Sequence, residues 1–360
     1  MAEVREGLTF KGRGAVNNPT GRFATRATVP FDDGWGSLED EPDPLKTILH
    51  PAASRTIITY NKSPDLPFDR SINPYQGCEH GCIYCYARPS HSYLDLSPGL
   101  DFETQIFYKP NAAARLLAEW QKPGYECKPI TIGANTDPYQ PAEKSLKITR
   151  QLLQLFVEYR HPVNIITKSH LVCRDLDLLE NLASDNLCSI AMSIPTMSDD
   201  LKRIMEPRVP AAKSRLKAAQ ELSKAGVPVS LLLAPVIPAI NDGEIETILK
   251  AAADAGMLQA SYIFLRLPHE LKQLFEEWLR THFSDRADHV FSLIKQSSGG
   301  KPYEHRFGLR QTGRGPYADM IGARFRRACK QFGLETDTYQ QELDCSQFSG
   351  PANRQLGLDL

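Results

Sequence analysis

The chain has 360 residues, of which 41% are hydrophobic and 24% charged, values typical of a folded protein with a sizeable core. Its 42 Lys and Arg residues balance 43 Asp and Glu residues, which excludes binding to polyanions through overall charge and leaves only a local basic patch for nucleic acid. No segment approaches the roughly 18 consecutive apolar residues of a membrane span, and the N-terminus lacks the apolar core of a signal peptide. We therefore expect a cytoplasmic protein, in which cysteines stay reduced, bind metal or take part in chemistry.

The composition changes along the chain and divides it into three regions. Residues 1–60 are rich in glycine and proline, carry an acidic run at 39–44 and show no sustained apolar period. We expect them to form an extended N-terminal arm that lies over the rest of the molecule. We place the core at 61–284 and a C-terminal extension at 285–360, where the regular pattern fades.

Short apolar segments alternate with longer helical patterns from about residue 70 onward. The predicted strands are 71–75, 130–132, 163–167, 188–194, 227–233 and 261–265, each bounded by turn residues. The predicted helices are 112–120, 145–159, 173–183, 211–225, 244–255 and 270–282. Such alternation indicates an α/β fold with a parallel sheet and right-handed crossovers. Six βα units predict a partial (β/α)6 barrel of the TIM type, with its chemistry at the carboxyl ends of the strands.

The C-terminal extension carries a basic segment at 301–330, and a short helix is predicted at 321–331. The segment holds eight Lys or Arg residues against two acidic residues. Four aromatic residues lie among the basic ones, namely Tyr303, Phe307, Tyr317 and Phe325. Aromatic rings between cations are typical of surfaces on which bases stack, so this segment is a candidate contact for nucleic acid. The alternative is a solvated helix face that packs against the barrel.

Three of the eight cysteines, Cys78, Cys82 and Cys85, fall within eight consecutive positions in the spacing Cys-x3-Cys-x2-Cys. Clustered thiolates of this kind are what a metal site needs. Three thiolates can hold three irons of a four-iron cube and leave the fourth iron open to another ligand. The alternative is a structural zinc site, in which His80 or His91 would be the fourth ligand.

These residues carry a resemblance to a known family. The Cys-x3-Cys-x2-Cys motif, with the aromatic Tyr84 before its last cysteine and a strand that opens a βα barrel before it, resembles the radical S-adenosylmethionine superfamily. The likeness covers roughly residues 70–267. Within that superfamily the sequence is similar to the spore photoproduct lyase-like branch, and the matching segments are 77–86, 135–140, 165–169, 192–195 and 206–208.

The resemblance implies a mechanism and its cofactors. A [4Fe-4S] cluster would bind S-adenosylmethionine through the open iron and cleave it reductively, and the resulting radical would abstract hydrogen from a substrate that is not identified, with nucleic acid as one candidate. A protein of the flavodoxin or ferredoxin kind would supply the electron. The competing hypothesis is a non-catalytic or structural-zinc protein that binds nucleic acid.

Polar residues follow three neighbouring predicted strands, and they are candidates for cofactor binding. They are Asn135, Thr136 and Asp137 after the second strand, Lys168 after the third, and Ser193 at the end of the fourth. The resemblance implies that Lys168 pairs with the carboxylate of S-adenosylmethionine and that Asn135, Thr136 and Asp137 accept hydrogen bonds from its ammonium group. It implies that Ser193 bonds a ribose hydroxyl or the carboxylate, and it adds Tyr84 to the cofactor-binding set.

Each of these assignments has a structural alternative. Asp137 precedes a proline and would also suit an ordinary turn or helix cap. Lys168 could be solvated, and the hydroxyl of Ser193 could be satisfied by its own backbone. Glu206 and Arg208 flank a proline, and they are expected to form a salt bridge at the rim of the barrel or to contact substrate.

Overall fold

The computed structural model describes residues 11–24, 45–301, 303, 306–336 and 342–351, so the predicted arm and the basic segment are described only in part. Its centre is a seven-stranded sheet with the strand order β10-β9-β8-β7-β6-β3-β2. These strands are β2 (Ile58–Tyr60), β3 (Arg70–Ile72), β6 (Ile130–Ile132), β7 (Val163–Thr167), β8 (Cys188–Ser193), β9 (Val229–Val236) and β10 (Gln259–Phe264). Six strands of this sheet run parallel, namely β3, β6, β7, β8, β9 and β10. Strand β2 pairs with β3 antiparallel. The predicted partial barrel of six parallel strands is therefore confirmed.

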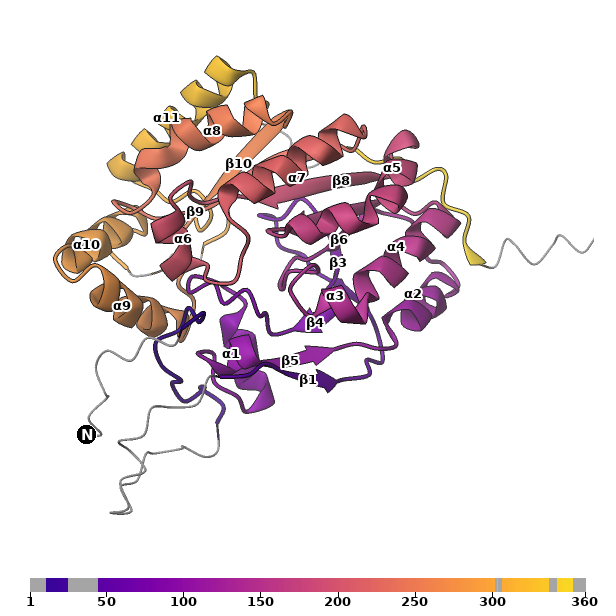
Figure 1. Ribbon diagram of the computed structural model, residues 1–360, viewed down its shortest axis with the longest axis horizontal. Helices are drawn as coiled ribbons and strands as arrows, with labels where there is room; N and C mark the ends of the chain where they lie inside the picture. The colour runs from indigo at the N-terminus through magenta and orange to yellow at the C-terminus, as the bar shows by residue number, and fades with distance from the viewer. Residues whose placement is uncertain (1–10, 25–44, 302, 304–305, 337–341, 352–360) are drawn as a thin grey trace, which may run out of the picture.

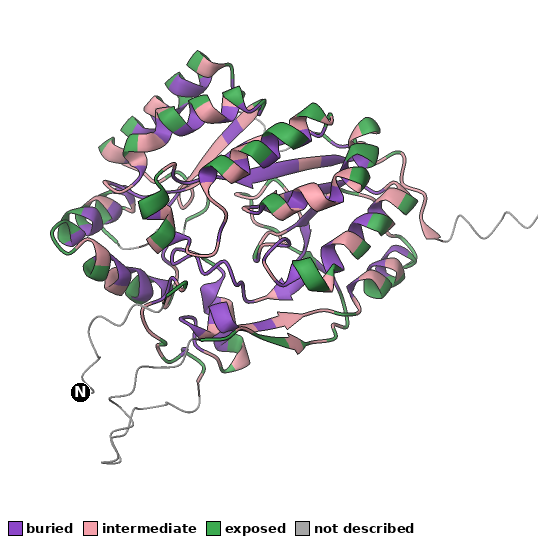
Figure 2. Cartoon of the chain, viewed as in Figure 1, coloured by how far each residue is buried: buried purple, intermediate pink, exposed green. Residues whose placement is uncertain are grey.

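Helices connect the parallel strands and cover the outside of the sheet (Figure 1). They are α2 (Ala112–Trp120), α3 (Glu143–Leu146), α4 (Ile148–Tyr159), η2 (His170–Asp175), α5 (Leu176–Ser184), α6 (Asp199–Met205), α7 (Ala212–Lys224), η3 (Asp242–Glu244) and α8 (Ile245–Asp254). The helix predicted at 145–159 is divided because Lys147 has a φ of 54° and interrupts the helical hydrogen bonds. Figure 2 shows the resulting layers, with buried strands and with helices exposed on their outer faces.

A second, three-stranded sheet lies beside the barrel and was not predicted. Its order is β1-β5-β4, with β1 (Ile48–Pro51), β5 (Gln105–Tyr108) and β4 (Tyr75–Gln76). Two short helical segments, η1 (Arg88–Leu94) and α1 (Asp101–Thr104), precede β5. Strands β1 and β2 both fall within the predicted extended arm, so the arm includes regular structure at Ile48–Pro51 and Ile58–Tyr60. Strands this short leave no periodic signal, since their partners are distant in sequence.

The helix predicted at 270–282 is present as α9 (Leu271–His282). Regular structure continues after residue 284, where the sequence predicted that it fades, because α10 (Ala287–Ser297) and α11 (Pro316–Phe332) follow. Helix α11 begins five residues before the predicted 321–331, because Pro316 occupies its first turn. It packs against α8, where Arg324 pairs with Glu246 at 2.7 Å.

A loop of the C-terminal extension joins the two edges of the incomplete barrel. The backbone N–H of Phe264, at the end of the last strand, donates to the carbonyl of Gln311 at 2.7 Å. One residue earlier in this loop, Arg310 forms an ion pair with Asp65 and donates to Ser63 Oγ at 2.6 Å, in the connection between β2 and β3. The described part of the loop therefore spans the open side of the barrel.

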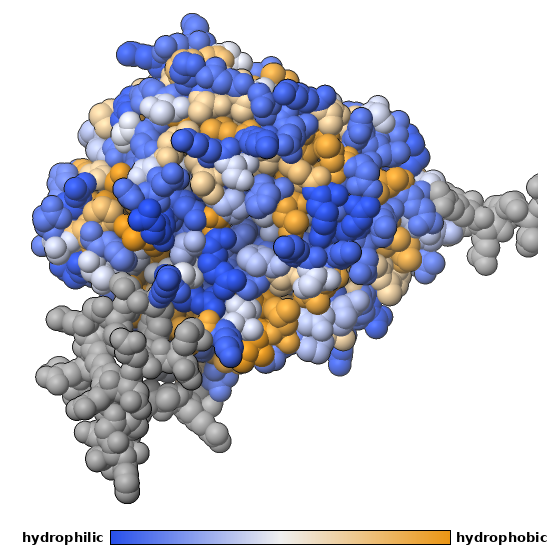
Figure 3. All heavy atoms as spheres, in the orientation of Figure 1, coloured by the Kyte–Doolittle hydropathy of each residue, from blue (hydrophilic) through white to orange (hydrophobic). Residues whose placement is uncertain are grey.

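The surface of the molecule is largely polar. Figure 3 shows that hydrophilic residues cover most of the face drawn, with hydrophobic residues scattered among them. Within the described part of the chain, no helix combines the length and the apolar character that a membrane span requires.

Candidate functional site

The three clustered cysteines lie on a loop, residues 77–87, that follows β4 at the carboxyl edge of the barrel. Cys78 and Cys82 are each 6% exposed, Cys85 is half-buried, and all three are free thiols. The loop is held at both ends, because Cys78 N–H donates to the carbonyl of Phe102 at 2.9 Å and Ile83 N–H to that of Met205 at 3.1 Å. The sequence motif thus becomes a fixed, water-poor loop of three thiols.

The thiols influence one another electrostatically. Burial raises the pKa of Cys78 well above its ordinary value, and Asp137, Cys82 and Cys85 raise it further. Burial likewise raises the pKa of Cys82 and of Cys85, although Lys168 opposes the shift in both. Thiols in this environment are protonated when no metal is bound, and a metal that binds them releases protons.

The spacing of the donors bears on the kind of metal group that they could hold. Among the described residues, no three His, Cys, Asp or Glu side chains are close enough to one another to ligate one ion. Of the two histidines considered as a fourth ligand, His80 has its Nδ1 3.4 Å from Asp137 Oδ2, and His91 has its Nε2 3.0 Å from the carbonyl of Gln105, while Nδ1 of each ring is buried without a hydrogen-bond partner in the described part of the chain. In a four-iron cube each thiolate binds a different iron, so its sulfur atoms are spaced more widely than the ligands of one ion.

Asp137 acts as a hydrogen-bond centre at the ends of β6 and β7. Its carboxylate accepts from the Lys168 N–H at 2.7 Å, the Thr167 hydroxyl at 2.7 Å and the Tyr139 N–H at 2.9 Å. Burial alone would raise the pKa of Asp137, but the adjacent His80 and these hydrogen bonds hold that pKa below its usual value. The carboxylate therefore fixes the strand ends against each other and against the cysteine loop.

The two residues before Asp137 differ in their exposure. Thr136 is buried, and its hydroxyl donates to the carbonyl of Tyr75 at 2.7 Å, which ties β6 to the start of the cysteine loop. Asn135 is exposed, and its N–H donates to Asn73 Oδ1 at 2.8 Å. Of the three residues predicted after β6, Asn135 is the one whose side chain faces solvent.

Lys168 and Ser193, predicted from neighbouring strand ends, are in direct contact. The ammonium of Lys168 donates to the hydroxyl of Ser193, which in turn donates to the carbonyl of Ala234 at 3.2 Å. The ammonium also lies 5.6 Å from the ring centre of Tyr84, a residue that the sequence places between Cys82 and Cys85. The structure thus brings together Lys168, Ser193 and Tyr84 beside the cysteine loop.

Glu206 completes this group, in a role that the sequence did not predict. It is fully buried and accepts hydrogen bonds from Arg215 at 2.7 Å and from the Tyr84 hydroxyl. Burial alone would raise the pKa of Glu206, but Arg215, then Lys168 and Tyr84, hold it below its usual value. The predicted pairing of Glu206 with Arg208 at the rim is wrong, because Arg208 pairs with Glu79 at 3.2 Å.

One sequence signal could have pointed to this buried pair. The buried residues of α7 are Ala212, Arg215, Ala218, Ala219 and Leu222, which follow the apolar spacing of an amphipathic helix. An arginine on such a stripe needs a buried acidic partner. The sequence does not say which acidic residue that partner is.

Tyr86, directly after the last cysteine, spans the mouth of the barrel. Its hydroxyl donates to the carbonyl of Ala134 after β6, and the guanidinium of Arg266 after β10 lies 5.4 Å from its ring centre. Tyr86 is 44% exposed, so this residue stands between the cysteine loop and solvent.

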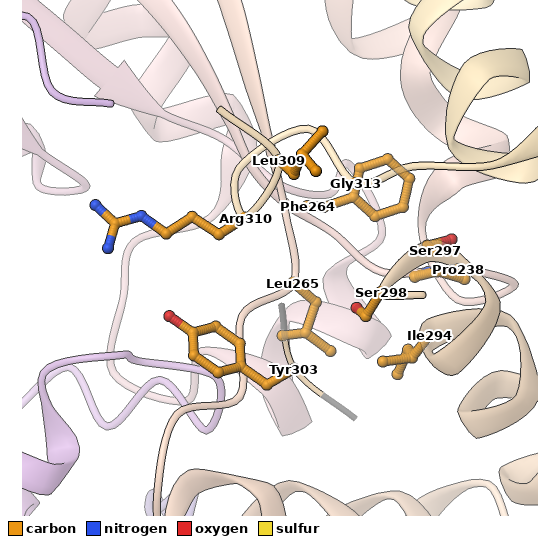
Figure 4. A pocket seen from close by; sticks show the side chains of 10 residues that line it. All are labelled: Pro238, Phe264, Leu265, Ile294, Ser297, Ser298, Tyr303, Leu309, Arg310 and Gly313. Atoms are coloured by element: carbon orange, nitrogen blue, oxygen red, sulfur yellow. The ribbon is translucent and has the colours of Figure 1, made fainter. Parts of the chain in front are cut away.

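A cavity lies beside the end of β10, apart from the cysteines. Figure 4 shows Leu265, Ile294 and Pro238 among its lining residues, and it shows Arg310 extending away from them. The guanidinium of Arg310 is engaged by Asp65, and the remaining lining mixes apolar side chains with the polar Ser297, Ser298 and Tyr303. None of the three clustered cysteines lines this cavity.

The remaining cysteines lie away from the loop. Cys127 and Cys345 are free thiols that raise or lower each other's pKa, and Cys127 lies before β6, at the amino end of the barrel. Cys188 and Cys329 are buried in the core, and Cys173 is partly buried against α7.

Comparisons with known proteins agree with this architecture. The family model of the radical SAM superfamily matches residues 72–252. An uncharacterized protein of Mycobacterium tuberculosis is 36% identical over 228 residues, which cover 62% of this chain and 67% of that protein. An uncharacterized protein of Methanocaldococcus jannaschii is 27% identical over 234 residues, 62% of this chain and 85% of that protein.

The similar solved structures include several of spore photoproduct lyase. One mutant of that enzyme gives a TM-score of 0.60 at 16% identity and covers 89% of both chains. Another, with bound AdoMet and dinucleoside spore photoproduct, gives 0.59 at 17% identity and covers 81% of this chain and 82% of that one. Identities this low establish a shared fold and no more. With the family model matching half of its length, the chain belongs to the radical SAM superfamily.

Proposed function

We propose that this protein is an enzyme that binds a [4Fe-4S] cluster through Cys78, Cys82 and Cys85 and uses it to cleave S-adenosylmethionine reductively. The observation that carries the proposal is the group of three free thiols, two buried and one half-buried, on one loop at the carboxyl edge of the barrel, next to Lys168. When bound, the cluster supplies one electron to the sulfonium of S-adenosylmethionine, and the 5′-deoxyadenosyl radical so released takes a hydrogen atom from a substrate.

The side chains around the loop have distinct tasks in this proposal. The ammonium of Lys168, already oriented by Ser193 and Glu206, holds the carboxylate of S-adenosylmethionine. Asn135 presents an exposed amide oxygen to the ammonium group of the same ligand. Thr136 and Asp137 contribute by fixing the strand ends, and Tyr84 packs beside Lys168.

The burial of the loop serves the same chemistry. A radical that abstracts hydrogen reacts with any accessible donor, so the site must exclude water and stray thiols. Cys127, Cys173, Cys188, Cys329 and Cys345 all lie away from the loop in the fold. The protein thus keeps its other thiols apart from the place where the radical would form.

Nucleic acid is the substrate class that we propose, and residues 301–330 are its contact. Lys301, Arg306, Arg326, Arg327 and Lys330 are exposed on the C-terminal extension, whose loop at Gln311 meets the carboxyl end of β10. Phe307 is 57% exposed, with the guanidinium of Arg310 4.6 Å from its ring centre. Phe325 is buried in the core, Tyr317 is bonded to Asp242 and the hydroxyl of Tyr303 accepts from Arg266 at 3.2 Å, so stacking on bases would rest on Phe307.

The physiological electron donor in this proposal is a flavodoxin or ferredoxin in the cytoplasm.

Dithionite replaces that donor in the test of the proposed function. Anaerobically reconstituted protein is incubated with dithionite and S-adenosylmethionine, and iron content and 5′-deoxyadenosine are measured. We expect about four irons per chain and formation of 5′-deoxyadenosine without any substrate.

The same experiment tests the alternatives. Iron-loaded protein that forms no 5′-deoxyadenosine would favour a non-catalytic role, and protein that retains zinc and no iron would favour a structural-zinc protein. A parallel reaction with single-stranded DNA tests the substrate class. Faster formation of 5′-deoxyadenosine with DNA supports nucleic acid, and an unchanged rate argues for another class of substrate.

A further inference from the structure

Residues 13–15 lie directly against the cysteine loop, although more than sixty positions separate the two segments in the sequence. Ala15 is 1% exposed and packs in one hydrophobic cluster with Cys82, Ile83 and Tyr84. At Gly14 the two backbones touch: a Cβ atom added there would lie 1.9 Å from the carbonyl oxygen of Gly81. Only glycine fits between this segment and the loop.

A fully buried carboxylate fixes the segment in place. Glu103, in α1, accepts hydrogen bonds from the backbone N–H of Gly14 at 3.0 Å and of Ala15 at 2.9 Å. In addition, the guanidinium of Arg13 donates to the backbone carbonyl of Glu103 at 3.0 Å. Two consecutive N–H groups on one carboxylate hold the backbone of the segment in a defined position.

The same carboxylate connects the segment to the cysteine loop. Glu103 pairs with Arg88 at 2.5 Å, and both side chains are fully buried. Arg88 in turn donates to the carbonyl of Cys82 at 2.8 Å and to that of Gly81 at 3.0 Å. A continuous chain of hydrogen bonds therefore runs from Gly14 through Glu103 and Arg88 to the backbone of the loop.

The rest of the described segment continues across the surface to α9. Arg22 pairs with Glu270, immediately before α9, at 3.1 Å. Gly99 lies against the backbone of Asn17 and Asn18, since a Cβ added to Gly99 would be 2.3 Å from the carbonyl of Asn17. The segment is thus attached at several points, and its tightest contact is the one at the cysteine loop.

A buried ion pair such as Glu103–Arg88 is a costly way to stabilise a fold, because two charges lose their hydration. What this pair does provide is a fixed geometry for two backbone segments. We propose that residues 11–24 form a seal that shields the cluster-binding cysteines from solvent and oxidants, with Glu103 as the positioning residue that holds the seal closed. This inference rests on the proposed function, since it gives the seal a cluster to protect.

The first experiment measures thiol access in the metal-free protein. Gly14→Ala forces the segment away from Gly81 without altering a side chain of the barrel. Gly243→Ala is the matched control, because a Cβ there meets nothing within 4 Å. Iodoacetamide labelling followed by mass spectrometry gives the alkylation rate of each cysteine, with the buried Cys188 as an internal control for global unfolding.

We expect Gly14→Ala to raise the alkylation rate of Cys82 about tenfold. The displaced segment would lose the hydrogen bond from the Gly14 N–H to the Glu103 carboxylate, and the loss of one hydrogen bond to a charged group changes the equilibrium between closed and open segment by about that factor. Cys188 should react at its wild-type rate, and Gly243→Ala should match the wild type at both positions. Equal rates at Cys82 in the wild type, Gly14→Ala and Gly243→Ala would overturn the proposal. Glu103→Gln provides a second variant, for which faster labelling of Cys82 is again expected.

The second experiment uses the iron-loaded protein. The visible absorbance of the cluster is followed after exposure to air, and we expect Gly14→Ala to lose its colour several times faster than Gly243→Ala. Under strict anaerobiosis Gly14→Ala should still form 5′-deoxyadenosine. If the wild type forms none while labelling of Cys82 still depends on Gly14, the proposed function fails and the seal stands. Equal loss of colour in the two variants would count against the seal.

Discussion

The ammonium of Lys168 lies 3.7 Å from the carboxylate of Glu206, and it donates a hydrogen bond to the hydroxyl of Ser193. These three residues come from the ends of β7 and β8 and from the turn after α6. Glu206 is in turn fixed by Arg215, which also donates to the carbonyl of Ser193 at 2.8 Å. The position of the lysine beside the cysteine loop is therefore determined by a buried network.

Replacement of Lys168 by alanine should weaken binding of S-adenosylmethionine by about tenfold to a hundredfold. The reason is that a charge-assisted hydrogen bond to the carboxylate of the ligand contributes roughly 1.5–3 kcal/mol. Iron content should stay at the wild-type level, since Lys168 is not a ligand of the metal. Equilibrium dialysis of the reconstituted proteins gives the affinity, and Lys250→Ala, at an exposed i,i+4 pair on α8, is the control. An unchanged affinity in Lys168→Ala would remove this residue from the site.

Replacement of Cys82 by alanine should abolish formation of 5′-deoxyadenosine. A four-iron cube held by only two thiolates is not retained, so this variant should also be colourless and low in iron after reconstitution. Cys173→Ala is the control, because Cys173 lies against α7 and away from the loop. We expect that control to keep wild-type iron content and activity. Retention of the full cluster in Cys82→Ala would contradict the ligand assignment.

Replacement of Glu206 by glutamine should destabilise the metal-free fold by about 3–5 kcal/mol, because it leaves the fully buried Arg215 without a counter-charge. The matched control is Glu246→Gln, which breaks a comparable arginine pair on the surface of α8. A half-exposed pair of this kind contributes at most about 1 kcal/mol. Urea unfolding of the two variants and the wild type gives the difference. Equal losses in the two variants would show that burial does not set the strength of the pair.

The elements with a clear apolar period could be predicted from the sequence. Helix α2 and strands β6 and β7 have the predicted limits, since local spacing alone defines them. The general location of the candidate site could also be predicted from the sequence. Parallel strands bring their carboxyl ends to one edge of the sheet, and Lys168 and Ser193 meet at that edge.

The contacts that hold the site together depend on tertiary structure and could not be predicted. Glu103 binds Gly14 and Ala15 across 89 and 88 positions, and nothing in the local sequence marks these residues as partners. The break between α3 and α4 depends on the left-handed backbone of Lys147, a residue type with no preference for that conformation. Strands β1 and β4 form only because β5 lies between them.

The stability of the fold should depend on pH through His161, which is buried at the amino end of the barrel. Its ring stacks on Trp120 with centroids 4.7 Å apart, and the hydroxyl of Tyr125 lies 2.8 Å from Nε2. Nδ1 lies 2.9 Å from the carbonyl of Pro162, so the neutral ring has both nitrogen atoms bonded. Burial lowers the pKa of His161 to about 3, and the hydrogen bond to Pro162 opposes this only in part.

The direction of the effect follows from proton binding in the two states. In the unfolded chain the pKa of histidine is about 6.5, so below that pH the unfolded state binds a proton that the folded state does not. The neutral His161 ring contributes its full stabilisation well above pH 6.5. As the pH falls from there toward 3, the free energy of unfolding decreases by up to about 1.4 kcal/mol per pH unit. Between about pH 6.5 and 5 the wild type should therefore lose about 1.6 kcal/mol from this group, because the unfolded histidine is already half protonated at pH 6.5. Urea unfolding at these two pH values should give a smaller loss for His161→Gln than for the wild type, whereas His289→Gln, at an exposed position on α10, should behave as the wild type does. The same loss of stability in all three proteins would show that the pKa of His161 is not lowered in the folded protein.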